Sequence, residues 1–246
     1  FDNWELWKEI RQLPLAEQQA RLSDPELRAR LVAIANSEYT GPRIVGAELR
    51  PPDWDYVYPM DDMAYDKPSM AQIAAQKGVD PVELMIDMAL EKDLKMFFRT
   101  PIANENMDDV LEMMKHPRSV VTFSDSGAHV AQIMDSSLQT HLLSYWVREK
   151  QALSLEAAIR QITYDTATLW GLHDRGLVRQ GMTADLLVFD PDTIGARLPE
   201  VVHDLPAGAR RLKQTADGLK HSIVAGEIVL TNNEHTGAVP GRLLRS

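Results

Sequence analysis

The sequence predicts an α/β fold in which helices and buried strands alternate, followed by a small all-β module. Between residues 69 and 123 the apolar pattern reads helix, helix, strand, helix, strand, which is typical of a barrel or a doubly wound sheet. Residues 120–123, Val-Val-Thr-Phe, form a β-branched run of the kind found in parallel strands covered by helices on both faces. Strand-like runs return at residue 185, so α/β material comes first and a β module last.

The first third of the chain is expected to be mainly helical. One apolar stripe recurs every third residue, at Trp4, Trp7, Ile10 and Leu13. A second helix is expected to begin at Ser23, with Glu26 three residues on, and to end by Asn36. Residues 41–59 hold four prolines, which disfavour a helix. We therefore expect two short strands there, at residues 43–49 and 54–58.

From residue 69 onward, the sequence shows residues typical of both the N-terminal and the C-terminal caps of helices. Ser69 and Gln72 make a capping box, and Gly78 is expected to end that helix. The pair Asp80-Pro81 is typical of the start of the next helix, which should reach about residue 92. The later elements are expected as a strand at 94–98, a helix at 106–116, the strand at 120–123, helices at 138–149 and 155–169, a strand at 185–190, an irregular segment at 191–218, and a hairpin of 222–224 with 227–230.

Composition excludes several classes of function. The chain has 26 Lys and Arg against 36 Asp and Glu, a net charge of −10, which argues against a nucleic-acid partner. It has no cysteine, which excludes disulfides and thiolate metal sites. No apolar run reaches about 18 residues, so no membrane partner is expected. No leader sequence is visible, which favours a cytoplasmic location.

The strongest chemical signal lies in residues 124–129, Ser-Asp-Ser-Gly-Ala-His, directly after the 120–123 run. In parallel α/β folds the carboxyl ends of the strands form the active-site face. Asp125 is therefore a candidate metal ligand or general base, and His129 could reach the same pocket. The alternative, on spacing alone, is that Asp125 caps the following segment and His129 satisfies a loop.

Two weaker candidates lie upstream. Arg99 follows the strand expected at 94–98 and could bind a substrate carboxylate through two hydrogen bonds, although a surface ion pair suits it equally well. The acidic residues Asp61, Asp62 and Asp66 could bind a cation, but a solvated loop is the better interpretation.

Several catalytic motifs are absent from the sequence. The seven histidines form neither a His-x-His pair nor a His-Glu-x-x-His motif. A Walker loop, a Gly-x-Gly-x-x-Gly loop and a Gly-x-Ser-x-Gly nucleophile are also missing. By exclusion, Asp125 remains the strongest candidate for chemistry.

Residues 124–129 resemble the strand-eight motif of the D-aminoacylases, the N-acyl-D-amino-acid deacylase branch of the amidohydrolase superfamily. Further stretches fit this family in order: Ser154-Leu-Glu-Ala-Ala-Ile-Arg with Thr166-Ala167, then residues 171–176 with 181–190, then 224–229 with 236–245. The resemblance extends from about Leu94 to the end of the chain, and the helical first third fits more loosely.

This resemblance implies the C-terminal part of a TIM-type barrel with a helical insertion in residues 1–172, and part of a small β-sandwich in residues 173–246. It implies a hydrolase that depends on zinc or another divalent metal and cleaves a small N-acylated substrate. Asp125 would lie on the metal side, take a proton from the attacking water and deliver it to the leaving nitrogen. His129 would approach the substrate, and Ser126 stands where the family often has Gly. We expect His129, Ser126 and Arg99 to be the substrate contacts.

The family's metal-binding histidines should lie upstream of these residues. We therefore expect most metal ligands, and the N-terminal half of the enzyme, to come from outside this chain; the sequence does not indicate an oligomeric state. Two other interpretations stay open: a catalytically silent barrel relative that acts as a binding or partner module, and a cyclic-amide hydrolase of the hydantoinase or dihydroorotase type. An Asp125 that faces bulk solvent, away from any cavity at the barrel mouth, would overturn the hydrolase hypothesis.

Overall fold

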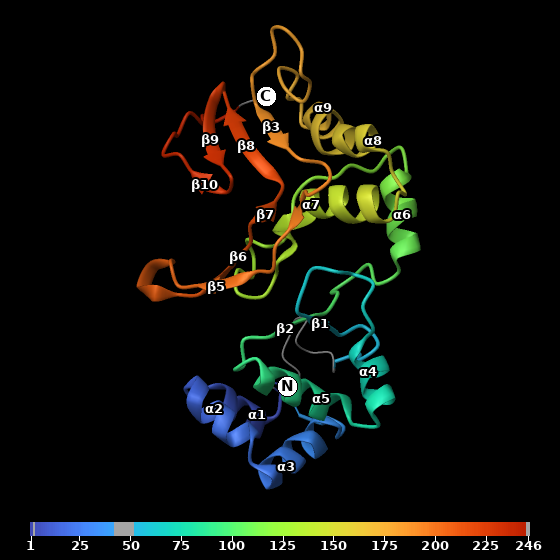
Figure 1. The fold of residues 1–246 in the computed structure, drawn as a ribbon, viewed down its shortest axis with the longest axis vertical. Coiled ribbons are helices and arrows are strands. Elements are labelled where there is room, and N and C mark those ends of the chain that lie inside the picture. The colour runs from blue at the N-terminus through green and yellow to red at the C-terminus, as the bar shows by residue number, and fades with distance from the viewer. Residues whose placement is uncertain (2, 42–51, 245–246) are drawn as a thin grey trace. The chain divides into compact units, whose positions relative to one another are not determined.

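The structure is a computed structural model that describes residues 1, 3–41 and 52–244. The chain divides into two compact units, Phe1–Asn106 and Met107–Ser246, and each is described by itself (Figure 1). The strand expected at residues 43–49 lies outside the described residues. The domain boundary expected after residue 172 stays a prediction. None of the described helices combines the length and the apolar character that crossing a membrane requires.

Helices dominate the first unit (Figure 1). They are α1 (Glu5–Arg11), α2 (Leu15–Leu22), α3 (Pro25–Ala35), α4 (Met70–Lys77) and α5 (Pro81–Glu91). One buried cluster joins α1, α2, α3 and α5 through Ile10, Leu22, Leu27, Leu31, Val82 and Ile86. A second cluster joins α4 and α5 to the segment before the first strand through Val57, Met70, Ala74 and Leu84. Burying these side chains removes apolar surface from water, which stabilises the unit.

The first helices differ from expectation in two places. Pro14 precedes α2, a helix that the apolar stripe did not predict, because the chain ends α1 at Arg11 and starts again. The N-cap of α3 is Asp24 and not Ser23. The Asp24 carboxylate accepts the backbone N–H groups of Glu26 (2.9 Å) and Leu27 (3.1 Å). Proline is favoured at the first helical position, so Pro25 sets the cap one residue later than expected.

The capping signals of α4 and α5 are confirmed. Ser69 and Gln72 form a reciprocal capping box, and Gly78 ends α4 with φ of +69°. The Asp80 carboxylate accepts the N–H of Val82 at 2.8 Å, and α5 ends at Glu91. These local signals place both helices correctly because each satisfies backbone groups that a helix end leaves without partners.

The two described strands of the first unit pair antiparallel. They are β1 (Tyr58–Met60) and β2 (Phe97–Arg99), with Pro59 opposite Phe98. Both start three or four residues later than expected, so the predicted bounds 54–58 and 94–98 are wrong. Asp93 and Leu94 have φ of +52° and +59°, so the chain turns there and extends only afterwards.

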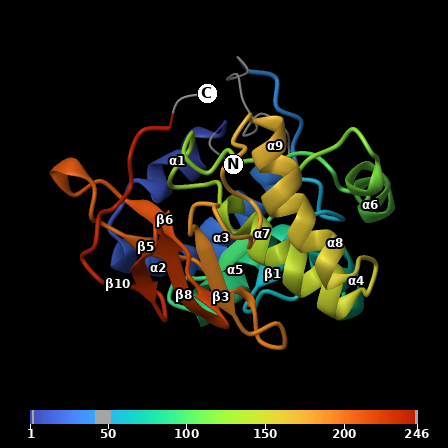
Figure 2. The same cartoon turned by 90° about the horizontal axis from the view of Figure 1, so that it is seen from above.

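The second unit begins with a series of helices. They are α6 (Met107–Lys115), a 3₁₀ turn (Asp135–Ser137), α7 (Leu138–His141) with a π-helix (Leu142–Glu149), and α8 (Leu155–Arg160) with a π-helix (Gln161–Asp165) and α9 (Thr166–Leu169). Figure 2 shows α8 and α9 as one continuous coil. The predicted cap is confirmed, since the Ser154 hydroxyl accepts the N–H of Ala157 at 3.2 Å. The helix predicted at 155–169 is thus present, with π-helical turns in its middle.

The β module follows the helices. One sheet has the order β10-β9-β8-β3, made by β3 (Leu186–Phe189), β8 (Leu219–Val224), β9 (Glu227–Thr231) and β10 (Glu234–His235). The predicted hairpin turn is confirmed, with φ of +50° at Ala225 and +86° at Gly226. The segment 191–218, expected to be irregular, holds a 3₁₀ turn (Pro206–Gly208) and two short pairs: β4 (Gly195–Ala196) with β7 (Ala216–Asp217), and β5 (Glu200–Val202) with β6 (Arg211–Lys213).

The mixed helix-and-sheet class is confirmed, but a parallel sheet is not formed by the part of the chain that the structure describes. Every strand pairing in it is antiparallel. Residues 120–123 are not a strand, and Phe123 is 75% exposed. A strand exists only when its backbone groups pair with a neighbour, and no neighbouring described strand reaches this segment.

Candidate functional site

The predicted site residues of the second unit lie on one turn, residues 124–129, which we call the motif loop. Ser124 and Ser126 share a hydrogen bond between their hydroxyls at 2.8 Å, and the N–H of Ala128 donates to the carbonyl of Asp125 at 2.8 Å. Asp125 and His129 are exposed, whereas Ser126 is half-buried. The Asp125 carboxylate makes no hydrogen bond within the described residues, so the alternative that it caps the following segment is not observed.

Two contacts tie the surroundings of the motif loop to other elements. Before the loop, the hydroxyl of Thr166, the first residue of α9, donates to the carbonyl of Val121 at 2.6 Å. After the loop, the N–H of Leu212 in β6 donates to the carbonyl of Val130 at 2.7 Å. Neither residue was predicted as part of the site, because both bonds end on a backbone carbonyl far away in sequence, and such an acceptor leaves no signal in the residue types.

A cavity of about 230 Å³ lies beside this region. Its lining comes from α6, from the segment before the motif loop and from the π-helix after α8: Met113, Met114, Ser119, Val120, Val121 and Gln161. Asp125 is not part of this lining. The expectation that Asp125 is enclosed in a pocket is therefore not met by the residues described, and this observation counts against a complete hydrolase site within this chain.

Arg99 belongs to the first unit, at the end of β2. Its guanidinium carbon lies 3.8 Å from the ring centroid of Tyr65 and 4.9 Å from that of Tyr58. Its Nη2 donates to the carbonyl of Tyr65 at 3.4 Å. Within the described residues Arg99 forms no ion pair, so the alternative of a surface ion pair is not observed there. The two rings hold the half-buried cation through the quadrupole of their faces.

The acidic cluster of the first unit is paired with a lysine. Lys67 forms ion pairs with Asp61 and, at 2.9 Å, with Asp62, and both carboxylates are exposed. The hydrogen bond from Lys67 lowers the pKa of Asp61, and the backbone N–H of Ala64 together with Lys67 lowers the pKa of Asp62. The lysine thus offsets part of the negative charge that would attract a cation. This arrangement agrees with the solvated loop and not with a metal site.

A metal centre is not assembled by the residues that the structure describes. Across residues 1, 3–41 and 52–244, no group of three or more His, Asp or Glu side chains could hold a metal ion. A zinc ion in a hydrolase takes three protein ligands and leaves one open position. The described residues do not fit such a site on their own, and an exposed Asp125 supplies one carboxylate at most.

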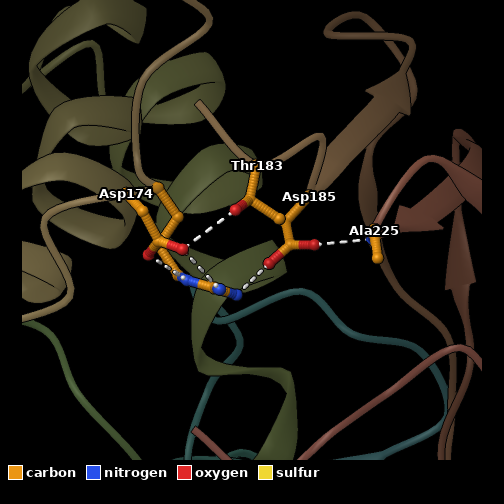
Figure 3. A network of polar contacts seen from close by, with 5 residues as sticks. Asp174, Thr183, Asp185 and Ala225 are labelled. Carbon is orange, nitrogen blue, oxygen red and sulfur yellow. Dashed lines mark hydrogen bonds and ion pairs between the residues drawn. The ribbon is translucent and has the colours of Figure 1, made fainter. Parts of the chain in front are cut away.

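A polar network that sequence reasoning missed joins the loop after α9 to the β module, and Figure 3 shows its geometry. Arg175 donates to both oxygens of Asp174, at 3.0 and 3.2 Å, and to Oδ2 of Asp185. Thr183 donates to Asp174 at 3.0 Å, and the N–H of Ala225 donates to Asp185 at 2.8 Å. The hydrogen bonds from Arg175, and then from Thr183, lower the pKa of Asp174. The network is a structural link between the helices and the hairpin turn.

The sequence profile of the amidohydrolase family matches residues 5–230, so the chain belongs to the amidohydrolase family. Among curated relatives it is 33% identical over 125 residues to the N-acyl-D-aspartate deacylase of Alcaligenes xylosoxydans xylosoxydans, a match that covers 50% of this chain and 21% of that protein. It is 37% identical over 106 residues to the N-acyl-D-glutamate deacylase of the same organism, covering 43% of this chain and 20% of that one. The chain thus spans about a fifth of the length of these relatives. The predicted resemblance is confirmed.

Solved structures of the same group are also similar to the chain. A D-aminoacylase mutant in complex with CuCl₂ matches with a TM-score of 0.48 and 21% identity, over 77% of this chain and 38% of that one. The N-acyl-D-glutamate deacylase of Bordetella bronchiseptica, complexed with zinc and a phosphonate inhibitor, matches with a TM-score of 0.41 and 24% identity, over 72% and 35%.

Proposed function

We propose that this chain forms the C-terminal portion of a metal-dependent amidohydrolase that hydrolyses the amide bond of an N-acylated D-amino acid. The single observation that carries the proposal is the membership in the amidohydrolase family together with 33% and 37% identity to two N-acyl-D-amino-acid deacylases. Residues 1–172 would form part of a TIM-type barrel and residues 173–246 part of a β-sandwich. The proposal includes a cytoplasmic location, which fractionation of the source cells would test.

Asp125 is the proposed proton carrier of this reaction. A free carboxylate with no partner among the described residues can accept a proton from an attacking water and later release it to the leaving nitrogen. Its exposure in this chain requires that the remainder of the enzyme cover it, because general base catalysis depends on close contact with the reacting water. His129 and Ser126, on the same turn, are the proposed substrate contacts.

Arg99 is the proposed binding residue for a substrate carboxylate. Tyr58 and Tyr65 hold its guanidinium group, and no carboxylate of the described residues neutralises it. A planar guanidinium can donate two parallel hydrogen bonds to a carboxylate, and a lysine cannot. Replacing Arg99 by Lys in the complete enzyme should raise KM for an acidic N-acyl amino acid by about tenfold while changing kcat much less.

Zinc or another divalent metal is part of this proposal, with most of its ligands supplied from outside the described residues. The N-terminal half of the enzyme, in the same polypeptide or in a second chain, is the proposed source. Metal analysis of the complete enzyme tests this point directly, since a metal-free active enzyme would contradict it.

The experiment that tests the function uses the complete enzyme with N-acetyl-D-aspartate, N-acetyl-D-glutamate and their L-enantiomers as substrates. We expect hydrolysis of a D-substrate, and a loss of turnover of about a hundredfold or more in Asp125→Asn with the fold retained. Glu112→Gln, which removes an exposed carboxylate on α6, is the matched control and should keep full turnover. Near-normal turnover in Asp125→Asn would remove its catalytic role.

A second candidate function is a catalytically silent relative that acts as a binding or partner module. The exposed Asp125 and the lack of a metal-binding group among the described residues favour it. A complete protein that folds, contains no metal and hydrolyses none of the substrates would support this candidate. A cyclic-amide hydrolase is distinguished by including hydantoin and dihydroorotate in the substrate panel.

A further inference from the structure

Among the described residues, two hydrogen bonds join the segment that contains the motif loop to other elements of its unit. In residues 119–134, the hydrogen bonds that reach other elements of the described chain are Thr166 Oγ1 to the Val121 carbonyl, at 2.6 Å, and Leu212 N–H to the Val130 carbonyl, at 2.7 Å. The other hydrogen bonds of this segment join near neighbours in sequence, such as the N–H groups of Ala128, Gln132 and Ile133 to carbonyls three or four residues earlier.

We propose that Thr166 and Leu212 are positioning residues, which clamp the motif loop from both ends and thereby fix where Asp125 and His129 lie. Val121 precedes Asp125 by four residues, and Val130 directly follows His129. One clamp comes from the helix α9 and the other from the hairpin of β5 and β6. The catalytic consequence rests on the proposed function, but the clamp itself does not.

The Thr166 clamp depends on a single hydroxyl proton. Oγ1 of Thr166 lies 2.6 Å from the Val121 carbonyl and 2.8 Å from the carbonyl of Gln161, five residues earlier in the π-helical turn. One hydroxyl can donate to only one acceptor at a time, so the two carbonyls share it. Thr166 and Val121 are half-buried, and water would only partly replace the lost hydrogen bond. Valine has nearly the same shape as threonine and lacks the donor, so Thr166→Val isolates the hydrogen bond.

The Leu212 clamp is made by the edge of β6 that does not face β5. Leu212 lies opposite Val201 in the antiparallel pair of β5 and β6. Because its N–H donates to Val130, this group points away from β5, as in the pairs of an antiparallel ladder that do not exchange hydrogen bonds. Proline at this position would therefore remove the clamp without removing a hydrogen bond between β5 and β6. Leu212→Ala is the matched control, because it shortens the side chain and keeps the donor.

Hydrogen–deuterium exchange of the protein measures the clamp without any assay of activity. The amide of Ala128 reports on the motif loop, those of Gln132 and Ile133 report on the turn that directly follows it, and those of β8 and β9 report on the fold. We expect loop exchange to become about five- to tenfold faster in Thr166→Val and Leu212→Pro, with unchanged rates in Thr166→Ser and Leu212→Ala and in the β8–β9 hairpin of all four variants.

Several results would overturn the clamp. The clamp is refuted if the loop amides exchange at the same rate in each variant as in its control. It is also refuted if the loop amides of the wild type already exchange at the rate of an unprotected amide. Loss of protection in β8 and β9 in both Thr166→Val and Leu212→Pro would show that these bonds hold the whole unit and not the loop. If only one of the two variants loses protection in β8 and β9, the exchange rates of the motif loop in the other variant decide whether the clamp exists.

Kinetics of the complete enzyme then test the catalytic consequence. Thr166→Val and Leu212→Pro should lower kcat about tenfold or more and change KM by less than about twofold, because a misplaced Asp125 affects the chemical step more than binding. Thr166→Ser should restore kcat. An enzyme whose wild type hydrolyses none of the substrates would refute the proposed function, while the exchange experiment would still decide the clamp.

Discussion

Arg175 is joined to Asp185 across ten residues of sequence, and Asp185 in turn accepts the N–H of Ala225 in the turn between β8 and β9. The same guanidinium donates to both oxygens of Asp174. The Arg175 side chain is only 15% exposed and that of Asp185 27%, so water competes weakly for these groups. A planar donor fork is what allows one side chain to serve two carboxylates at once.

Arg175→Lys should lower the free energy of unfolding by about 1–2 kcal/mol, because lysine keeps the charge and loses the fork of donors. Urea unfolding of the protein measures this change. Arg160→Lys is the matched control: Arg160 pairs with Asp165 on the surface, with 66% of its side chain exposed, and its replacement should have no measurable effect. An equal loss of unfolding free energy in both variants would show that the Arg175 network contributes no more stability than an exposed ion pair.

Asp174 should make the stability of the protein depend on pH in the acid range. Its pKa is lowered from the ordinary value of 3.8, first by the hydrogen bond from Arg175 and then by that from Thr183. A carboxyl group with a lowered pKa in the folded state stabilises that state above its ordinary pKa, and the contribution is lost as pH falls through the folded-state value. Stability should therefore decline below about pH 3.8, and less steeply in Asp174→Asn. Urea midpoints at pH 5.5 and pH 3 compare the two proteins, and identical declines would contradict the prediction.

Gly218→Ala should be strongly destabilising. Gly218 has φ of +70°, and a Cβ atom there would lie 2.5 Å from the backbone nitrogen of Ile194 and 2.7 Å from its Cα. Backbone atoms cannot move aside as a flexible side chain can, so we expect a loss of about 3 kcal/mol or more. Gly181 has φ of +88°, and a Cβ atom there would meet nothing within 4 Å, so Gly181→Ala should cost only about 1 kcal/mol of backbone strain. Similar unfolding free energies for the two variants would contradict the close approach.

Asn233 should stabilise the β module through its side-chain amide. Its Oδ1 accepts the N–H of Ala216 at 3.2 Å, and its Nδ2 donates to the Ala216 carbonyl at 2.7 Å, so it pairs with β7 as a strand would. Glycine suits the φ of +70° at this position, so Asn233→Gly removes the two hydrogen bonds without adding strain. We expect a loss of about 1–3 kcal/mol. Asn232→Gly, at φ of +48°, is the control and should change stability by less than about 0.5 kcal/mol in thermal unfolding.

Local chemistry explains which elements could be predicted. The capping box of Ser69 and Gln72, the start of α5 at Asp80 and Pro81, and the cap at Ser154 act on backbone groups within three residues. Such signals are complete in the sequence, because both partners are close along the chain. The error at α3, where Asp24 replaces Ser23 as the cap, is a competition between two neighbouring residues that Pro25 decides.

The sequence by itself determined the family, the caps of α4, α5 and α8, and the hairpin turn at Ala225 and Gly226. Tertiary structure decided the conformation of residues 120–123, since a β-branched run forms a strand only beside a partner strand. It decided as well that Asp125 is exposed. It also brought Arg175 to Asp185 and Thr166 to Val121. The partners in these contacts are far apart in the sequence, and no helix or strand repeat relates them. Only the folded chain therefore reveals that they meet.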